Sequence, residues 1–352
     1  MFKLLRILVP LLGAERAHDW AIMLLHSLGR VPGAKWLMGK IYAVHHPSLE
    51  REVFGLKFRN PVGIAAGYDR NGEIFRELGA LGFGFVEIGT VTPMHQPGNP
   101  KPRVFRLEDD KAILNRIGLS SKGLERVISN LRSGNKNVVV GCNIGKNTIT
   151  PPENAPADYL RVFRNLYQYV DYFTVNVSYN TTFKQYVPRT RESIMAILEP
   201  LFDFRRGQNQ YRPILLKISP DLSNEDIDMM TDIMIDTPLD GIVATNSTTH
   251  TQGLATPSQK LKSLGIGTIS GRPLTRRSVE VVRRIYARSN GTYPIIGVGG
   301  LMTPADVHQM LAAGATLVQV YTGFVYDGPQ LVGDICRSLI KPEEVEPSEA
   351  SE

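Results

Sequence analysis

The chain has 352 residues, of which 42% are hydrophobic and 21% are charged, a composition typical of a globular protein with a sizeable core. It has only two cysteines, and its seven histidines are scattered without ligand spacing, so neither a disulfide framework nor a metal site is expected. The formal net charge of +6 is compatible with a nucleic acid, an anionic membrane surface or an anionic ligand as partner.

The basic excess is clear in residues 1–45. This segment has two acidic residues, Glu15 and Asp19, many apolar side chains, and the basic residues Lys3, Arg6, Arg16, Arg30, Lys35 and Lys40. No apolar run in it approaches the roughly 20 residues needed to span a bilayer, and no signal-peptide cleavage site follows one. The pattern favours two short basic amphipathic helices that lie on a membrane surface. The alternative is a helical cap whose apolar face packs on the main domain.

Residues 46–340 repeat one theme, a short apolar, β-rich run followed by a helical pattern. Helices are predicted over 156–169, 223–235 and 304–313, and Ser223 is expected to cap the second of them. The β-rich runs lie at 62–67, 85–90, 138–144, 172–178, 213–219, 241–247, 294–300 and 317–323. Eight strands alternating with helices predict an α/β protein with a closed (β/α)8 TIM barrel, and a doubly wound open sheet is the alternative. The acidic tail, 341–352, is expected to be disordered.

The ends of the predicted strands carry residues that suit a ligand, and in such a barrel these ends converge on one face. Glycines follow the seventh and eighth strands, in "GVGG" and "YTG", and predict a phosphate pocket, or else only tight turns. Lys217 interrupts the apolar run "ILLKIS". Its ammonium there needs either a buried carboxylate partner or a cofactor that carries negative charge.

Several amides stand at strand ends or in the adjoining loops: Asn115, Asn143, Asn176, Asn180 and Asn246. Because an amide donates and accepts at once, such a set suits a planar ligand with an alternating edge, such as a flavin ring or a pyrimidine. No GxGxxG fingerprint follows any strand, and no histidine falls at a strand end. Flavin redox chemistry is therefore the reaction class that the residues favour.

Specific motifs run along the chain from residue 14 to residue 340. They include "NPVGIAAGYDRNGE" (60–73), "GFGFVEIGTVTP" (82–93), "DYFTVNVS" (171–178), "LLKISPDL" (215–222), "GIVATNST" (241–248), "PIIGVGG" (294–300) and "AAGATLVQVYTGF" (312–324). Together they resemble the class 2 dihydroorotate dehydrogenases, the membrane-associated, quinone-reducing group. The resemblance implies an FMN enzyme that oxidises dihydroorotate to orotate in de novo pyrimidine (UMP) biosynthesis, with a membrane quinone as electron acceptor.

By motif match, the resemblance also assigns residues. The flavin ring and ribityl chain would contact Ala66, Gly67, Thr90, Asn143, Asn176, Lys217 and Thr245, and the phosphate would contact Gly271, Gly300, Tyr321 and Thr322. The pyrimidine would be held by Arg70, Asn115, Asn176, Asn180, Asn246 and Ser247. Ser178 would be the base that removes a proton from carbon 5 of dihydroorotate, and Thr181 would help to relay it. His18 and Arg103 would lie near the quinone tunnel.

The chain departs from the family pattern around the substrate. The segment "NVSYNTTFKQYV" is one residue shorter than in the family and lacks its proline, which makes Tyr179 a rival base to Ser178. Arg70 stands where the family has a lysine, and Leu119 and Thr268 also differ from the family residues. Two alternatives follow. One is a related FMN barrel that acts on another dihydropyrimidine, and the other is a catalytically impaired, flavin-binding membrane-surface protein.

The resemblance implies a division of the chain as well. Residues 1–45 would form the membrane-associating segment and the quinone tunnel, and residues 46–340 would form the FMN-binding barrel. We expect a monomer without a nucleic-acid partner or a metal, bound peripherally to the cytoplasmic face of the cell membrane if the protein is bacterial.

Overall fold

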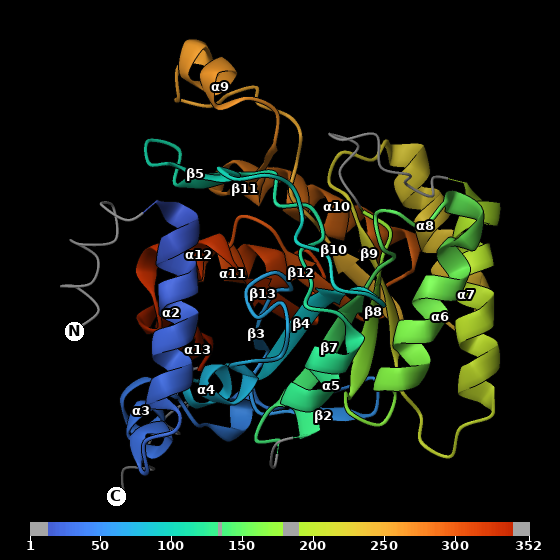
Figure 1. Cartoon of the computed structure of the whole chain (residues 1–352), viewed down its shortest axis with the longest axis horizontal. Helices are drawn as coiled ribbons and strands as arrows, with labels where there is room; N and C mark the ends of the chain where they lie inside the picture. The colour runs from blue at the N-terminus through green and yellow to red at the C-terminus, as the bar shows by residue number, and fades with distance from the viewer. Residues whose placement is uncertain (1–12, 133–135, 179–189, 341–352) are drawn as a thin grey trace, which may run out of the picture.

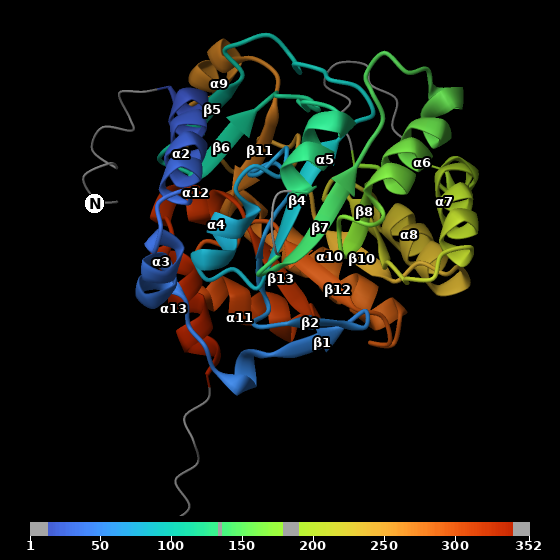
Figure 2. The same cartoon turned by 60° about the horizontal axis from the view of Figure 1, so that its bottom comes forward.

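The computed structural model describes residues 13–132, 136–178 and 190–340. Its centre is a closed barrel of eight parallel strands (Figures 1 and 2). In order around the barrel these are β3 (Val62–Ile64), β4 (Phe85–Val91), β7 (Val139–Ile144), β8 (Tyr172–Asn176), β9 (Ile214–Ile218), β10 (Gly241–Ala244), β12 (Ile295–Val298) and β13 (Leu317–Val320). The predicted (β/α)8 barrel is confirmed, and the open doubly wound sheet is wrong.

Side chains of each strand alternate between the barrel interior and the surrounding helices. On β4, Phe85 belongs to the interior cluster, whereas Val86 and Ile88 belong to the larger cluster under the helices. A hairpin that the sequence did not predict, β1 (Arg51–Val53) paired with β2 (Leu56–Phe58), adds Val53 and Phe58 to the interior cluster. Apolar packing therefore fills the interior on the hairpin side, and the polar strand ends lie at the opposite mouth.

Helices cover the outside of the barrel (Figure 2). They are α4 (Phe75–Ala80), α5 (Leu124–Arg132), α6 (Ala155–Leu166), α7 (Arg191–Arg206), α8 (Asn224–Asp236), α10 (Thr275–Arg288), α11 (Pro304–Ala312), α12 (Thr322–Asp327) and α13 (Gln330–Leu339). The three predicted helices correspond to α6, α8 and α11 and agree within three residues at each end. The expected cap of α8 is confirmed, because the Ser223 side chain accepts a hydrogen bond from the Asp226 backbone N–H.

A second, three-stranded antiparallel sheet was not predicted. It consists of β5 (Val104–Leu107), β6 (Ala112–Asn115) and β11 (Thr268–Gly271), with β6 in the middle. The pairing of Asn115 with Thr268 joins segments that are far apart in the chain. The short helix α9 (Ser258–Leu264) precedes β11 and projects away from the barrel (Figure 1). This sheet brings the 103–118 region over the mouth of the barrel, beside α2.

Two N-terminal helices pack on one side of the molecule, α2 (Ala14–Leu28) and α3 (Ala34–Tyr42). In Figures 1 and 2, α2 lies beside α12 and α3 lies close to α13. The inner face of these helices contributes Ile22, Leu25, Met38 and Tyr42 to the edge of the main core. Within the described ranges, neither these helices nor any other are long and apolar enough to cross a membrane.

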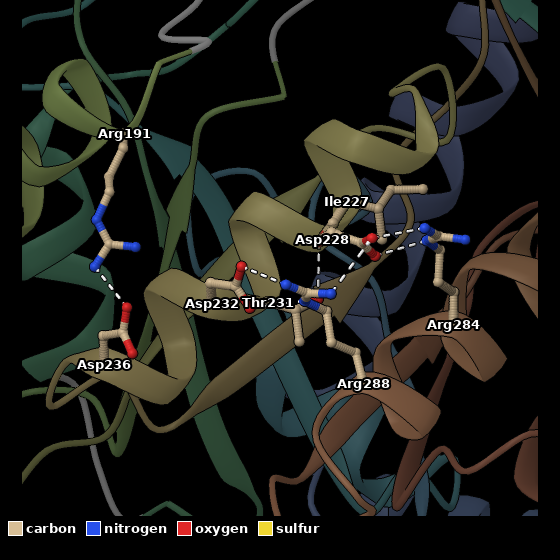
Figure 3. A network of polar contacts seen from close by, with 8 residues as sticks. All are labelled: Arg191, Ile227, Asp228, Thr231, Asp232, Asp236, Arg284 and Arg288. Atoms are coloured by element: carbon tan, nitrogen blue, oxygen red, sulfur yellow. Dashed lines mark hydrogen bonds and ion pairs between the residues drawn. The ribbon is translucent and has the colours of Figure 1, made fainter.

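Charged side chains join α8 to α10 on the outer surface (Figure 3). Arg284 donates to both carboxylate oxygens of Asp228, at 2.7 and 2.6 Å, and Arg288 does the same to Asp232 at the same distances. Arg288 also lies 3.5 Å from Asp228. These two bidentate arginine–carboxylate contacts fix the orientation of α8 relative to α10.

Candidate active site

A cavity of about 1080 Å³ opens at the carboxyl ends of the barrel strands. Its floor is made by strand ends and the turns that follow them, including Gly67, Thr90 and Thr245, and one wall is made by α2. The cavity therefore runs without interruption from the barrel mouth to the space between α2 and the barrel. One end is polar and the other is apolar, so it can hold a polar ring system and an apolar molecule near each other.

Most of the residues expected at the site line this one cavity. They are His18, Ala66, Gly67, Arg70, Thr90, Asn115, Asn176, Ser178, Lys217, Thr245, Asn246, Ser247, Gly271, Gly300, Tyr321 and Thr322. Among the described residues, Asn143 and Arg103 do not line the cavity. Each contacts a residue that does, because Asn143 accepts a hydrogen bond from Thr90 and Arg103 donates one to Glu15. Tyr179, Asn180 and Thr181 lie outside the described residues.

Strand β8 ends at Asn176, and Ser178 follows it two residues later into the cavity. The Ser178 hydroxyl donates to Asn176 Oδ1 at 2.8 Å and accepts a hydrogen bond from Asn246 Nδ2 at 2.8 Å. Asn246 is held in turn, because its Oδ1 accepts the backbone N–H of Ser247 at 2.8 Å. The ends of β8 and β10 thus fix one hydroxyl between two amides at the surface of the cavity.

Lys217 on β9 is a buried ammonium at the floor of the cavity. Burial lowers its pKa from the usual value, and the charge of Glu87 acts in the opposite direction. Among the described residues, neither a hydrogen bond nor an ion pair from Lys217 is found. The buried carboxylate foreseen as one partner is present as Glu87, but it acts from a distance, which leaves the ammonium free for a ligand.

The substrate side of the cavity is built around Thr268 of β11, one of the departures from the family pattern. Its Oγ1 accepts from Ser247 Oγ at 2.9 Å and lies 3.4 Å from the Asn115 side-chain nitrogen. Thr268 therefore connects two residues that were expected to hold the pyrimidine. Arg70 reaches the same cavity from the loop after β3, where its Nε donates to the Gly67 carbonyl at 3.3 Å.

Glycines allow the backbone to pass close to the cavity near β12. Gly300 has a φ of +77°, and a Cβ there would lie 2.3 Å from the backbone nitrogen of Thr275. The Thr275 hydroxyl donates to the Gly300 carbonyl at 2.7 Å. The Thr322 and Ser270 hydroxyls, which also line the cavity, are 2.8 Å apart. Small residues and hydroxyls thus line a surface of the kind that binds phosphate.

The wall of the cavity near α2 contains His18, whose ring packs edge to face on Tyr68 at a centroid distance of 5.0 Å. Burial, with the nearby positive charge of Arg70 as the second cause, lowers the pKa of His18 to about 3. The imidazole is therefore neutral at ordinary pH. A neutral ring beside an aromatic ring suits an uncharged planar molecule such as a quinone.

Arg103 holds α2 in place from behind the cavity wall. It donates to one carboxylate oxygen of Glu15 through Nε at 3.1 Å and Nη2 at 2.8 Å, and also to the carbonyls of Pro97 and Asn99. At the other end of α2, a ring nitrogen of His26 lies 3.0 Å from the Glu73 carbonyl. Arg103 thus supports the cavity wall through Glu15, which lines the cavity.

Three residues of the site were missed by the sequence reasoning: Tyr68, Glu87 and Gln319. Glu87 could have been found by the signal that revealed Lys217, because it is a charged residue inside the buried strand "FVEIGT". Gln319 is likewise a buried polar residue within β13. Tyr68 carries no such signal, since its role depends on α2, which the sequence does not place.

Known proteins are similar to this chain in sequence and in fold. The family model for dihydroorotate dehydrogenase matches residues 48–342. A dihydroorotate dehydrogenase (quinone) from Christiangramia forsetii is 44% identical over 327 residues, which cover 93% of this chain and 95% of that protein. A protein of the same name from Thermosynechococcus vestitus is 45% identical over 306 residues, 85% of this chain and 83% of that protein.

A solved structure agrees with these relatives. The crystal structure of DHODH in complex with ferulenol from Eimeria tenella matches with a TM-score of 0.83 at 32% identity, covering 95% of this chain and 93% of that chain. The match therefore includes the N-terminal helices as well as the barrel. The chain belongs to the dihydroorotate dehydrogenase family, in its quinone-dependent class 2.

Proposed function

We propose that this protein oxidises dihydroorotate to orotate in de novo pyrimidine synthesis and passes the electrons to a quinone, with FMN as its flavin. Family membership gives the dihydroorotate, quinone and flavin chemistry. The observation that carries the proposal for this chain is a single cavity that joins Ser178, Asn246 and Lys217 to the α2 wall.

The choice of FMN rests on the fit of the residues to a flavin mononucleotide. Lys217 offers an unpaired ammonium, and Gln319 has a buried Oε1 that lacks a hydrogen-bond partner in the described structure although the residue lines the cavity. Thr322 and the close backbone at Gly300 offer hydroxyl and N–H groups to one phosphate. These donors and the Gln319 acceptor suit a flavin ring at one end and its phosphate at the other.

When bound, the flavin supplies the two-electron acceptor for dihydroorotate and the electron donor for quinone. The residues position the substrate and move one proton. Asn115 and Asn246 offer amides to the pyrimidine edge, and Ser178 Oγ takes the proton from carbon 5. Because a serine hydroxyl has a very high pKa, Ser178 must pass its own proton to water or to a hydrogen-bonded chain as it accepts the proton from carbon 5. Its bonds to the two neighbouring amides hold the Ser178 oxygen at a fixed position in the cavity wall.

We place the quinone between α2 and the barrel. This part of the cavity is lined by apolar side chains of α2, among them Ala21, Leu25 and Leu28, and it reaches His18 and Tyr68 at its inner end. Tyr68 packs edge to face on both His18 and Tyr321, at centroid distances of 5.0 and 6.2 Å. A quinone in this position would lie one aromatic ring away from the proposed flavin site.

The outer face of the N-terminal helices supports a membrane-surface location. Trp20 and Met23 of α2 and Trp36, Leu37 and Ile41 of α3 are 59, 54, 67, 53 and 58% exposed, an unusual concentration of large apolar side chains on two short helices. Trp20 and Met23 also line the cavity, so its apolar end opens where these side chains meet solvent. Docking of this face on a bilayer would let a membrane quinone enter without crossing water. A peripheral location at the cytoplasmic face of the cell membrane is part of this proposal if the protein is bacterial, and the monomeric state stays a prediction.

Vesicle binding tests the membrane proposal. The double variant Trp36→Ser, Leu37→Ser is expected to bind anionic phosphatidylglycerol vesicles at least about tenfold more weakly than the wild type, because each side chain loses its burial in lipid. Ile266 is 70% exposed near α9, far along the chain from the N-terminal helices, and Ile266→Ser is the matched control. Equal loss in both variants, or in neither, would contradict a docking face on α2 and α3.

Anaerobic mixing tests the substrate. FMN-loaded protein is mixed with dihydroorotate while flavin absorbance is followed in wild type, Ser178→Ala and Tyr179→Phe. Rapid bleaching that is lost only in Ser178→Ala supports both the substrate and the base. A wild type that holds FMN and is bleached by dithionite but not by dihydroorotate would contradict the proposed substrate and favour another dihydropyrimidine.

A further inference from the structure

The barrel interior below the cavity contains a completely buried carboxylate, Glu87 of β4. Its Oε1 accepts a hydrogen bond from Asn143 Nδ2 at 2.9 Å. Its Oε2 accepts from Gln319 Nε2 at 2.8 Å, Thr174 Oγ1 at 3.0 Å and the Tyr172 hydroxyl at 3.3 Å. The donors come from β7, β13 and β8, so one side chain connects strands on both sides of the barrel.

These contacts fix the orientation of two amides, because a carboxylate only accepts and an amide nitrogen only donates. With its nitrogen on Glu87, Asn143 turns its Oδ1 to the Thr90 hydroxyl, which donates to it at 2.6 Å. Thr90 Oγ1 accepts from Asn176 Nδ2 at 3.2 Å, and Asn176 Oδ1 accepts from Ser178. A continuous series of hydrogen bonds therefore runs from Glu87 to the proposed base.

The second amide is Gln319. Its nitrogen donates to Glu87, so its Oε1 must point elsewhere, and this oxygen is buried without a hydrogen-bond partner in the described residues. A buried acceptor left unpaired is costly unless a ligand supplies a donor. An oxidised flavin carries one ring N–H, which is a donor of the required kind. As long as Glu87 accepts a hydrogen bond from Gln319 Nε2, the Gln319 amide cannot flip. Its Oε1 therefore remains the atom that can accept a hydrogen bond from the flavin.

Glu87 also affects the charge of Lys217. Lys217 is buried, and burial lowers its pKa, while Glu87 is the group whose charge opposes that effect. No direct ion pair joins the two side chains in the part of the chain that the structure covers. A buried ammonium without any opposite charge nearby would be strongly disfavoured. Glu87 therefore allows Lys217 to stay charged without occupying the donors that face the cavity.

We propose that Glu87 is a positioning residue of the flavin site, whose carboxylate balances the charge of Lys217 and orients the amides of Asn143 and Gln319. The proposal rests on the proposed function, since it concerns the same flavin. Glu87 acts through its neighbours and does not line the cavity itself.

Glu87→Gln keeps the shape of the side chain and removes its charge. In Glu87→Gln, the negative charge that reduction adds to the flavin replaces the lost carboxylate as the counter-charge of Lys217, so the bound flavin is expected to accept electrons more readily. The equilibrium constant for flavin reduction against a reference dye should rise by roughly tenfold or more. Tyr172→Phe is the matched control, since it removes one donor to Glu87 and leaves the charge, and its equilibrium constant should stay close to that of the wild type.

A double-mutant cycle in the flavin-free protein measures the charge coupling without any enzyme turnover. Glu87→Gln and Lys217→Met are each expected to lower the urea midpoint of unfolding, because each leaves one buried charge unbalanced. The urea midpoint of the double variant should fall by less than the sum of the decreases in the two single variants. If Glu87→Gln alone fails to fold, a double variant that folds supports the proposal, and a double variant that also fails overturns the charge balance.

The outcomes separate this proposal from the proposed function. A wild type that takes up no FMN would contradict the proposed function, while the cycle in the flavin-free protein would still report the coupling. A wild type that binds FMN, together with additive losses in the cycle and an unchanged flavin equilibrium in Glu87→Gln, would overturn the role of Glu87.

Discussion

Replacing Arg103 with methionine tests how α2 is held against the barrel. The Arg103 and Glu15 side chains are only 7 and 10% exposed, and they form an ion pair at 2.8 Å. Burial opposes ionisation of Glu15, but the hydrogen bonds and charge of Arg103 and Lys101 outweigh it, and the pKa of Glu15 lies below its usual value. Arg103→Met keeps the apolar part of the side chain and removes the groups that stabilise this buried carboxylate.

The size of the effect follows from burial. Removing one partner of a buried ion pair costs about 3–5 kcal/mol, because the other charge is left uncompensated. Lys101 lies 3.3 Å from the same Glu15 oxygen, but its side chain is 61% exposed, so it compensates only in part. We expect the lower end of the range, about 3 kcal/mol, which corresponds to a roughly 100-fold increase in local opening of α2.

Hydrogen exchange of backbone amides provides the assay, since it reports local opening. Amides in the first half of α2 should exchange roughly 100-fold faster in Arg103→Met, while amides of the barrel strands should keep their protection. Lys101→Met is the control and should change exchange in α2 only slightly, because the Lys101 side chain is 61% exposed and water screens its charge. Unchanged protection of α2 in Arg103→Met would refute the view that this pair anchors the helix.

Three further predictions concern protons and glycine. His18 has a pKa of about 3 in the folded state and about 6.5 unfolded, so the free energy of unfolding should fall by about 1 kcal/mol between pH 6.5 and 5.5, and His18→Gln should remove that part of the slope. The hydrogen bond from Arg284 lowers the pKa of Asp228. The stabilisation by this carboxylate should therefore be complete above about pH 4 and be lost as the pH falls through the folded-state pKa. An Asp228→Asn variant with the same acid-induced loss of melting temperature would contradict this. Gly300→Ala should lose FMN, measured by the flavin content of the purified protein, because its φ of +77° and the close Thr275 nitrogen leave no room for a Cβ; full flavin content would show that the backbone can shift.

The barrel could be predicted because each strand is a short apolar run with a helix after it, and this pattern depends on local sequence. The predicted ends were less accurate for a physical reason. The run 241–247 was predicted as strand, yet β10 stops at Ala244, because Thr245, Asn246 and Ser247 leave the sheet and line the cavity. A change from apolar to polar residues within a run therefore marks the point where a strand gives way to the site.

The sheet of β5, β6 and β11 could not be predicted in the same way. Its strands have four residues each, and its register pairs Asn115 with Thr268 across a long sequence separation. Short strands carry little periodicity, and nothing local records which distant strand they meet. The same limit applies to Arg103, whose contact with Glu15 depends on where α2 packs.

The N-terminal segment shows features of both interpretations drawn from the sequence. Part of each helix packs on the core, through Ile22 of α2 and Met38 of α3, as a helical cap would. Trp20 and Trp36 are exposed on the outside, as a membrane-docking surface requires. Amphipathic patterning identifies an apolar face but cannot show that one helix has two such faces with different partners.

In the proposed function, one cavity serves both dihydroorotate and quinone. The most direct measurement is the amount of orotate formed per quinone reduced by purified, FMN-loaded protein without oxygen. We predict a ratio of one to one, with both products lost in Ser178→Ala. Quinone reduction without orotate, or orotate formation that continues when no quinone is supplied, would contradict the coupling of the two reactions through this site.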